Sequence, residues 1–115
     1  MYALAFDLDM KALVANYPGA NANNAYGAIK QTLTARGFRW TQGSLYLLDN
    51  EDMSVLFQAI QDLMQITWFP RSVRDIRAFR VEQWSDFTAM VKGFAPGPGK
   101  SVGTTGQLFA VPKKP

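Results

Sequence analysis

The sequence contains neither cysteine nor histidine. Without cysteine, disulfides, thiolate metal sites and a cysteine nucleophile are excluded. Without histidine, imidazole acid–base chemistry and histidine-ligated zinc or iron are excluded as well. Any catalysis by this chain must therefore use carboxylates, hydroxyls, lysine, arginine or a bound ion.

Long apolar runs are also missing, since no stretch approaches the ~20 residues that a bilayer-spanning helix needs. Residues 1–7 have no basic segment and reach an aspartate at position 7, which is unlike a signal or transit peptide. We therefore expect a cytoplasmic protein with no membrane partner. Apolar residues nevertheless make up 48% of the 115 residues and aromatic residues 13%, which is enough for a single packed core.

The apolar pattern predicts four β-strands. Residues 2–9 alternate strictly between large apolar side chains and small or acidic ones, which is typical of a strand with one buried face. Two short strands are expected at 38–42 and 44–48, with Gly43 forming a tight turn or a bulge between them. Residues 73–81 are strand-like with imperfect alternation, which an edge position or a bulge would explain.

Two helices are expected between these strands. Asparagines at the start of 21–36 supply N-cap candidates for the first helix, and Gly37 is expected as its stop. Apolar residues recur at helical spacing over 52–66, which predicts an amphipathic helix that ends before residues 68–70. Residues 11–17 are expected only to lead out of the first strand.

The carboxyl-terminal part of the chain has a different composition. A short helical turn is expected at 85–92, with a serine at its start as N-cap and Gly93 as its stop. The last 22 residues contain four prolines and four glycines, so most of them are expected to lie outside a packed core. We therefore predict a domain at 1–93 and a basic tail at 94–115, in which residues 107–111 could add an edge strand to a sheet.

The order βαββαβ predicts an α+β fold, the ferredoxin-like sandwich, with an antiparallel sheet and two helices on one face. In that topology the strand order is 4-1-3-2, so the end of the first strand lies beside the beginnings of the third and fourth strands. Asp7 and Asp9 end the first strand, Ser44 begins the third and Asp75 begins the fourth. We therefore expect these residues to gather at one edge of the sheet.

Such a cluster admits two kinds of chemistry. Asp7 and Asp9 could hold a divalent cation, with Mg²⁺ as the candidate, or a carboxylate could act as general base toward a ribose 2′-hydroxyl. Either would serve phosphodiester cleavage. The alternative is that Asp7 and Asp9 are a solvated strand end and that Asp75 pairs with Arg74 or Arg77.

Positive charge is concentrated in the second part of the sequence. Residues 1–70 carry four basic and six acidic side chains, whereas residues 71–115 carry eight and three. Arginine recurs at positions 71, 74, 77 and 80, near Trp68, Phe69 and Trp84. Arginines beside exposed aromatic rings are typical of single-stranded RNA binding. The alternative is that Trp68 and Phe69 cap the core while the arginines are solvated.

Three blocks of the sequence resemble the virulence-associated protein D (VapD) family of endoribonucleases. They are residues 1–8 (MYALAFDL), 37–46 (GFRWTQGSLY) and 68–79 (WFPRSVRDIRAF), and the likeness continues to about residue 92. The resemblance implies a ferredoxin-like homodimer related to the small nuclease-like subunit of CRISPR adaptation complexes. It also implies a toxin-like ribonuclease that cuts single-stranded RNA, with a preference for purine sites.

The same resemblance implies which residues carry the activity. Asp7, Ser44 and Asp75 match active-site positions of the family, and Leu13 matches a supporting position that acts through packing. Apart from the resemblance, we expect the RNA substrate to be bound through arginines that neutralise phosphate charge, namely Arg71, Arg74 and Arg77. An antitoxin protein is the further partner that a toxin-like role suggests.

Two alternative functions stay open at this point. The scarcity of acid–base groups also fits a non-catalytic ferredoxin-like dimer that binds RNA or a partner protein without turnover. A purely structural subunit that neither binds nor cleaves RNA is a third reading. Incubation of the purified protein with labelled RNA separates these readings, because binding without product would favour the non-catalytic module.

Overall fold

The computed structural model describes residues 1–95 of the chain. These residues belong to two units, Met1–Trp84 and a second unit that starts at Ser85. The expected strand at 107–111 lies outside the described residues, and the expected domain boundary after residue 93 stays a prediction. Within residues 1–95, no helix has the length and apolar content that a membrane crossing requires.

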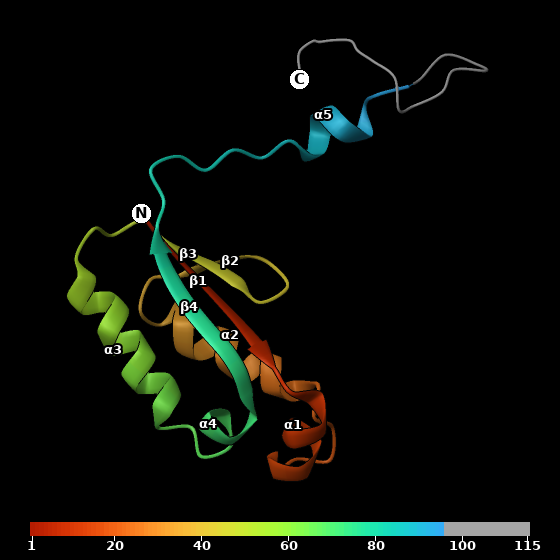
Figure 1. Ribbon diagram of the computed structural model, residues 1–115, viewed down its shortest axis with the longest axis vertical. Coiled ribbons are helices and arrows are strands. Elements are labelled where there is room, and N and C mark those ends of the chain that lie inside the picture. Colours follow the sequence, from red (N-terminus) through yellow and green to blue (C-terminus); the bar gives the residue numbers. More distant parts are fainter. Residues whose placement is uncertain (96–115) are drawn as a thin grey trace. The chain divides into compact units, whose positions relative to one another are not determined.

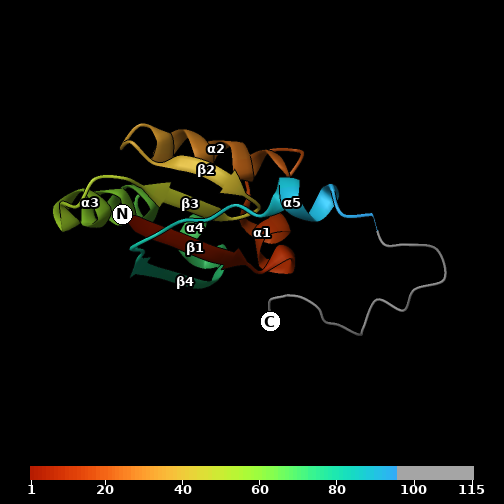
Figure 2. The ribbon, with the colours of Figure 1, turned by 90° about the horizontal axis from the view of Figure 1, so that it is seen from above.

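Within residues 1–95, four strands form one antiparallel sheet with the order β2-β3-β1-β4 (Figure 2). The strands are β1 (Tyr2–Leu8), β2 (Arg39–Gln42), β3 (Leu45–Leu48) and β4 (Val73–Arg80). This confirms the predicted ferredoxin-like strand order. The connection between β2 and β3 is the expected tight turn, in which Gly43 has a positive φ of 49°, and the register shifts in the preceding strand.

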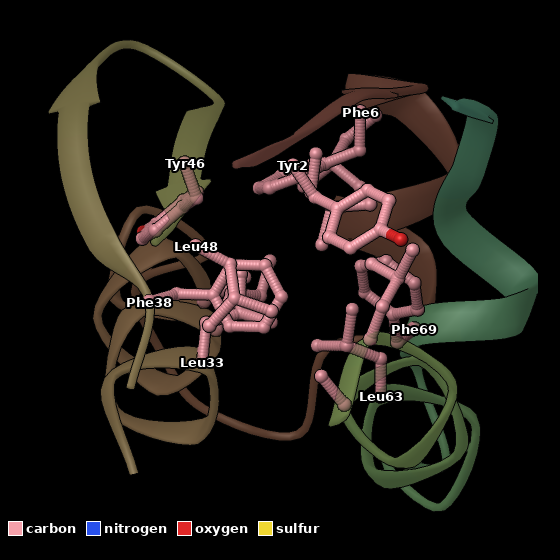
Figure 3. Close-up of a cluster of buried hydrophobic side chains, with 14 of the residues drawn as sticks. Tyr2, Phe6, Leu33, Phe38, Tyr46, Leu48, Leu63 and Phe69 are labelled. Atoms are coloured by element: carbon pink, nitrogen blue, oxygen red, sulfur yellow. The ribbon is translucent and has the colours of Figure 1, made fainter. Parts of the chain in front are cut away.

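Two helices, α2 (Asn24–Thr34) and α3 (Met53–Met64), pack on one face of the sheet (Figure 1). The alternation of β1 sends Tyr2, Leu4, Phe6 and Leu8 into the core between sheet and helices. Figure 3 shows this cluster, where Leu33 from α2 and Leu63 from α3 meet the strand residues. The predicted two-layer arrangement is therefore confirmed.

The end of α2 follows its sequence signal. Gly37 has a φ of 94°, a conformation that a residue without a Cβ adopts without strain. Its N–H donates to the carbonyl of Thr34 at 3.0 Å, and the N–H of Phe38 donates to that of Leu33 at 3.2 Å. These two bonds form a Schellman motif that turns the chain into β2. At the other end, the N-cap is Asn23, one of the expected asparagines; its own side chain makes no capping bond, and the Asn21 side chain accepts the Asn23 N–H at 3.0 Å.

Two short helices of the first unit differ from the prediction. Residues 10–16 form α1 (Met10–Asn16), because Asp9 caps the helix by accepting a hydrogen bond from the Ala12 N–H at 3.1 Å. Pro70 lies in the first turn of α4 (Phe69–Ser72), where the missing proline N–H costs no hydrogen bond. The prediction that residues 11–17 only leave the strand is therefore wrong.

The second unit contains α5 (Thr88–Lys92), which ends at Gly93 as expected. Its N-cap is Phe87 and makes no side-chain capping bond. A carboxylate oxygen of Asp86 accepts the hydrogen bond from the Thr88 N–H at 2.9 Å. The serine cap predicted at Ser85 is therefore wrong, because the helix begins three residues later.

Candidate active site

The carboxylates of Asp7 and Asp75 belong to directly opposed residues of neighbouring strands. Asp7 on β1 pairs in register with Asp75 on β4. Ser44 stands in the turn before β3, and its carbonyl accepts a hydrogen bond from the N–H of Phe6 at 3.2 Å. The topology thus brings three sequence-predicted site residues to adjacent positions at one end of three neighbouring strands.

These residues are open to a ligand. The side chain of Asp7 is 62% exposed and that of Asp75 is 49% exposed. Phe6 and Leu8, on either side of Asp7, are buried in the core, so the strand alternation turns Asp7 to the face opposite the helices. Ser44 is partly buried, and its hydroxyl has no hydrogen-bond partner among residues 1–95.

A break in strand register brings Arg74 to the carboxylates. Asp7 pairs with Asp75 and Leu8 with Val73, so Arg74 has no partner of its own. The predicted alternatives of an edge strand and a bulge both hold for β4, which lies at the end of the sheet order found in residues 1–95. Arg74 lies 3.3 Å from Asp7, measured from Nη1 to Oδ2, and its Nη2 lies 3.9 Å from an oxygen of Asp9.

Arg77 makes the second ion pair of the site, with Nε 3.1 Å from a carboxylate oxygen of Asp75. The pairing foreseen as the alternative for Asp75 is therefore present. Two like charges directly opposite each other on neighbouring strands are unfavourable, and each carboxylate has one guanidinium to balance it. Such exposed pairs are weak, so a phosphate group can replace a carboxylate as the partner of either arginine.

Arg71, the third predicted phosphate ligand, lies on α4 and is exposed. It forms no ion pair with the acidic side chains of residues 1–95. Its guanidinium is therefore available to an anionic ligand without first leaving a carboxylate within this part of the chain.

Asp9 has a structural role in addition to its contact with Arg74. One carboxylate oxygen caps α1, and the backbone N–H donates to the carbonyl of Ser72 at 2.7 Å. Within residues 1–95, no group of three or more acidic side chains is placed to hold a metal ion. Asp7 and Asp9 instead share the Arg74 guanidinium as their counter-charge.

Leu13 and Ser72 support the site from within the protein. Leu13 is fully buried in the core and has no exposed surface for a ligand. Ser72 is also fully buried, and its hydroxyl donates to the carbonyl of Trp68 at 2.6 Å. By accepting the Asp9 N–H, Ser72 ties the start of β4 to the end of β1. The sequence gives no signal for this role, since a serine before a strand is unremarkable.

Of the aromatic residues considered for RNA binding, Trp68 and Phe69 are buried, whereas Trp84 is 40% exposed. Trp68 and Phe69 belong to the core, and the Trp68 ring packs edge-on against that of Tyr17 at 5.3 Å. The prediction that they stack on RNA bases is therefore wrong, and the alternative of core caps holds. The exposed indole nearest in sequence to Ser44 is Trp40 on β2, whose exposed fraction is 49%.

No family model matches the sequence, but curated relatives do. The chain is 54% identical over 93 residues to "Endoribonuclease VapD" of Dichelobacter nodosus, covering 81% of this chain and 99% of the relative. It is 51% identical over 92 residues to the protein of the same name in Haemophilus influenzae, with 80% and 99% covered. For "Endoribonuclease VapD" of Helicobacter pylori, the identity is 50% over 94 residues, with 80% and 99% covered.

Proposed function

The chain belongs to the VapD family of endoribonucleases, and we propose that it cleaves single-stranded RNA with Asp7, Ser44 and Asp75 as its active-site residues. Membership supports the cleavage of RNA. The observation that carries the site is the in-register pair of Asp7 and Asp75, exposed and flanked by guanidinium groups. Carboxylates that can take a proton, next to cations that can bind phosphate, are what phosphodiester cleavage requires.

The proposed reaction uses the ribose 2′-hydroxyl as nucleophile. Asp7 accepts the hydroxyl proton, a bond forms between the 2′-oxygen and phosphorus, and the bond from phosphorus to the 5′-oxygen breaks. The departing 5′-oxygen takes a proton from water, which leaves a 2′,3′-cyclic phosphate. This route fits the donor set, because the carboxylates of Asp7 and Asp9 already face a guanidinium rather than a third acid.

Arg74 would couple the proton transfer to phosphate binding. Its guanidinium lies 3.3 Å from Asp7, and this pairing weakens once Asp7 is neutralised by the proton it accepts. The freed cation can then stabilise negative charge as it develops on the phosphate oxygens. Arg77 and Arg71 would bind neighbouring phosphates, while Ser44 and Asp75 would orient the attacking hydroxyl or the scissile phosphate.

The active form is proposed to be a homodimer formed through the face of the sheet opposite α2 and α3. Within Met1–Trp84, these helices cover only the other face. The proposed dimer face carries apolar side chains in cross-strand register, of which Ala3 and Leu47 are buried within the chain, Ala5 and Leu45 are partly buried and Phe79 is 52% exposed. A second copy on this face would bring the Asp7 of both protomers to a shared groove. The preference for purine sites, the toxin-like role and an antitoxin partner rest on the family resemblance.

The proposal is tested with labelled single-stranded RNA. Asp7→Asn keeps the size of the side chain but removes the base, so we expect cleavage to fall by about 100-fold or more. Asp62→Asn is the matched control, because Asp62 is also paired with an arginine, Arg36, but lies on α3 away from the site. Cleavage by Asp7→Asn at the rate of the control would contradict the proposed site, and RNA binding without product from the unmodified protein would favour the non-catalytic module.

A further inference from the structure

A cavity of about 490 Å³ lies between α2 and the β2–β3 hairpin. Its size falls within the range of about 300–1,000 Å³ that is usual for small-molecule pockets. Its lining combines aromatic, cationic and hydroxyl groups, from Tyr26, Gly27, Lys30, Trp40, Gly43, Ser44 and Tyr46. We propose that this pocket binds one nucleobase of the RNA strand, an inference that rests on the function proposed above.

Continuity with the active site identifies RNA as the occupant. Ser44 lines the pocket, and its carbonyl is bonded to the N–H of Phe6, the residue before Asp7. An RNA molecule with one phosphate at the carboxylates therefore needs to pass only around the ends of β1 and β3 to bring a base into the pocket. Ser44 would then lie where the RNA strand passes from the carboxylates on one face of the sheet to the pocket on the other.

Trp40 offers a fixed aromatic surface for stacking. Its Nε1–H donates to the carbonyl of Gly43 at 2.8 Å, which holds the half-exposed indole over the hairpin turn. The ammonium group of Lys30 lies 4.8 Å from the centre of the ring and has no ion pair with an acidic group of residues 1–95. The ammonium group lies over one face of the indole, so a base would stack on the other face or replace it there, with the cation close to the phosphate of that base.

Tyr46 supplies an unused hydrogen-bonding group inside the pocket. Its side chain is only 3% exposed, and its hydroxyl has no hydrogen-bond partner among residues 1–95. Figure 3 shows this hydroxyl at the outer side of the core cluster, away from Phe6. Burial raises the pKa of Tyr46, so the group stays protonated and can donate at neutral pH. Buried hydroxyls without partners are unfavourable, and a ring nitrogen or carbonyl of a base would satisfy this one.

Gly27 keeps the pocket open at a cost to the helix. It lies inside α2, where glycine is less favourable than alanine. A Cβ added at this position would meet no atom within 4 Å, so packing within the described chain does not require glycine there. A ligand that occupies the space next to Gly27 would explain why this position has no side chain.

The experiment fills the pocket from Gly27. Gly27→Leu places a helix-favouring side chain in the cavity, and Gln31→Leu adds the same side chain to an exposed position of α2 outside the lining. RNA binding is measured in the Asp7→Asn background, where the strand is not cut. We expect Gly27→Leu to weaken binding of a mixed-sequence RNA octamer by roughly 5- to 150-fold, the loss of one stacked base, and Gln31→Leu to leave binding unchanged.

Nuclear magnetic resonance locates the base. The chain has three tryptophans, and the RNA octamer should shift the indole N–H signal of Trp40 but not that of the buried Trp68. Full RNA affinity in Gly27→Leu, or RNA binding that does not shift the Trp40 signal, would contradict the proposed base pocket. The proposed function would still hold in that case if the unmodified protein cleaves RNA. If the unmodified protein neither binds nor cleaves RNA, the proposed function fails first.

Discussion

Asp9 stands two residues after Asp7, yet the contacts of the two carboxylates differ. Asp7 contacts Arg74 alone among the groups of the site, whereas Asp9 also caps α1 through the Ala12 N–H. The cap explains why an acid can occur at this position without any part in the chemistry. A change at Asp9 should therefore act on stability before it acts on cleavage.

This difference predicts the behaviour of two Asp9 variants. Asp9→Ser keeps an oxygen that can cap the helix, so we expect the stability to stay within about 0.5 kcal/mol of the original and the cleavage rate within a few-fold. Asp9→Ala removes the cap and should cost about 1 kcal/mol. Urea unfolding and the RNA assay measure both. A loss of 100-fold in cleavage by a stably folded Asp9→Ser would instead assign the carboxylate to catalysis.

At the scale of elements, α1 shows how a short helix escapes prediction. Leu13 is the only residue of α1 that is buried, and the one apolar side chain at helical spacing within the helix, Met10, is 44% exposed. Helix propensity and periodicity both need more than seven residues to stand out. The same helix nevertheless fixes the direction of the chain directly after Asp7 and Asp9.

Leu13 should therefore matter through packing. Leu13→Ala leaves a cavity under α1, and we expect a loss of about 2–5 kcal/mol in the free energy of unfolding. Leu13→Met keeps the volume and should cost less than about 1.5 kcal/mol. Cleavage should follow the folded fraction in both variants, as measured by circular dichroism beside the RNA assay. A fully folded Leu13→Met without cleavage would contradict a packing role.

Two aspartates at opposite ends of α3, Asp52 at its N-cap and Asp62 in its last turn, predict a pH dependence of stability. Hydrogen bonds from Ser54 lower the pKa of Asp52, and a hydrogen bond from Arg36 lowers the pKa of Asp62. Both groups therefore stabilise the folded state above the pKa of an unfolded aspartate, about 3.9, and lose this contribution as the pH falls through their lower folded values.

The test compares the original protein with the double variant Asp52→Asn, Asp62→Asn. The original should lose more stability than the variant between pH 5 and pH 2, and the two should differ most at neutral pH. Thermal unfolding followed by circular dichroism across this range measures the difference. Parallel curves for the two proteins would show that these carboxylates do not contribute in the way their contacts indicate.

At the scale of the molecule, sequence reasoning succeeds where one residue pattern decides one feature. The strict alternation of β1 determines that Asp7 faces away from the helices, and the order of elements determines that β1 lies between β3 and β4. It fails where a side chain chooses among tertiary partners. Trp68 could be exposed or buried on composition alone, and Arg74 reaches Asp7 only because the register shifts between β1 and β4.

The same limit applies to the pocket, since two separate segments build it. Tyr26, Gly27 and Lys30 come from α2, and Trp40, Ser44 and Tyr46 from the hairpin. No spacing in the sequence links Gly27 to Ser44. Only the packing of α2 over β2 and β3 makes the helix glycine and the turn serine line one cavity.

The proposed dimer face of the sheet, opposite α2 and α3, leads to the last prediction, which concerns the assembly. Phe79 on β4 is 52% exposed and lies in cross-strand register with the buried Ala3. In a symmetric dimer across this face, Phe79→Glu would introduce two like charges into the interface. We expect this variant to be monomeric in analytical ultracentrifugation at concentrations where the original is dimeric.

Phe57→Glu is the matched control for this prediction. Phe57 is equally an exposed phenylalanine, but it lies on α3, which packs on the opposite face of the sheet. Phe57→Glu should leave the dimer intact.

If the two Asp7 residues share one groove, Phe79→Glu should also lose RNA cleavage, because a monomer presents half of the site. If monomeric Phe79→Glu cleaves RNA at the original rate per subunit, each protomer carries a complete site. If the original protein is monomeric at every concentration, the proposed dimer is ruled out.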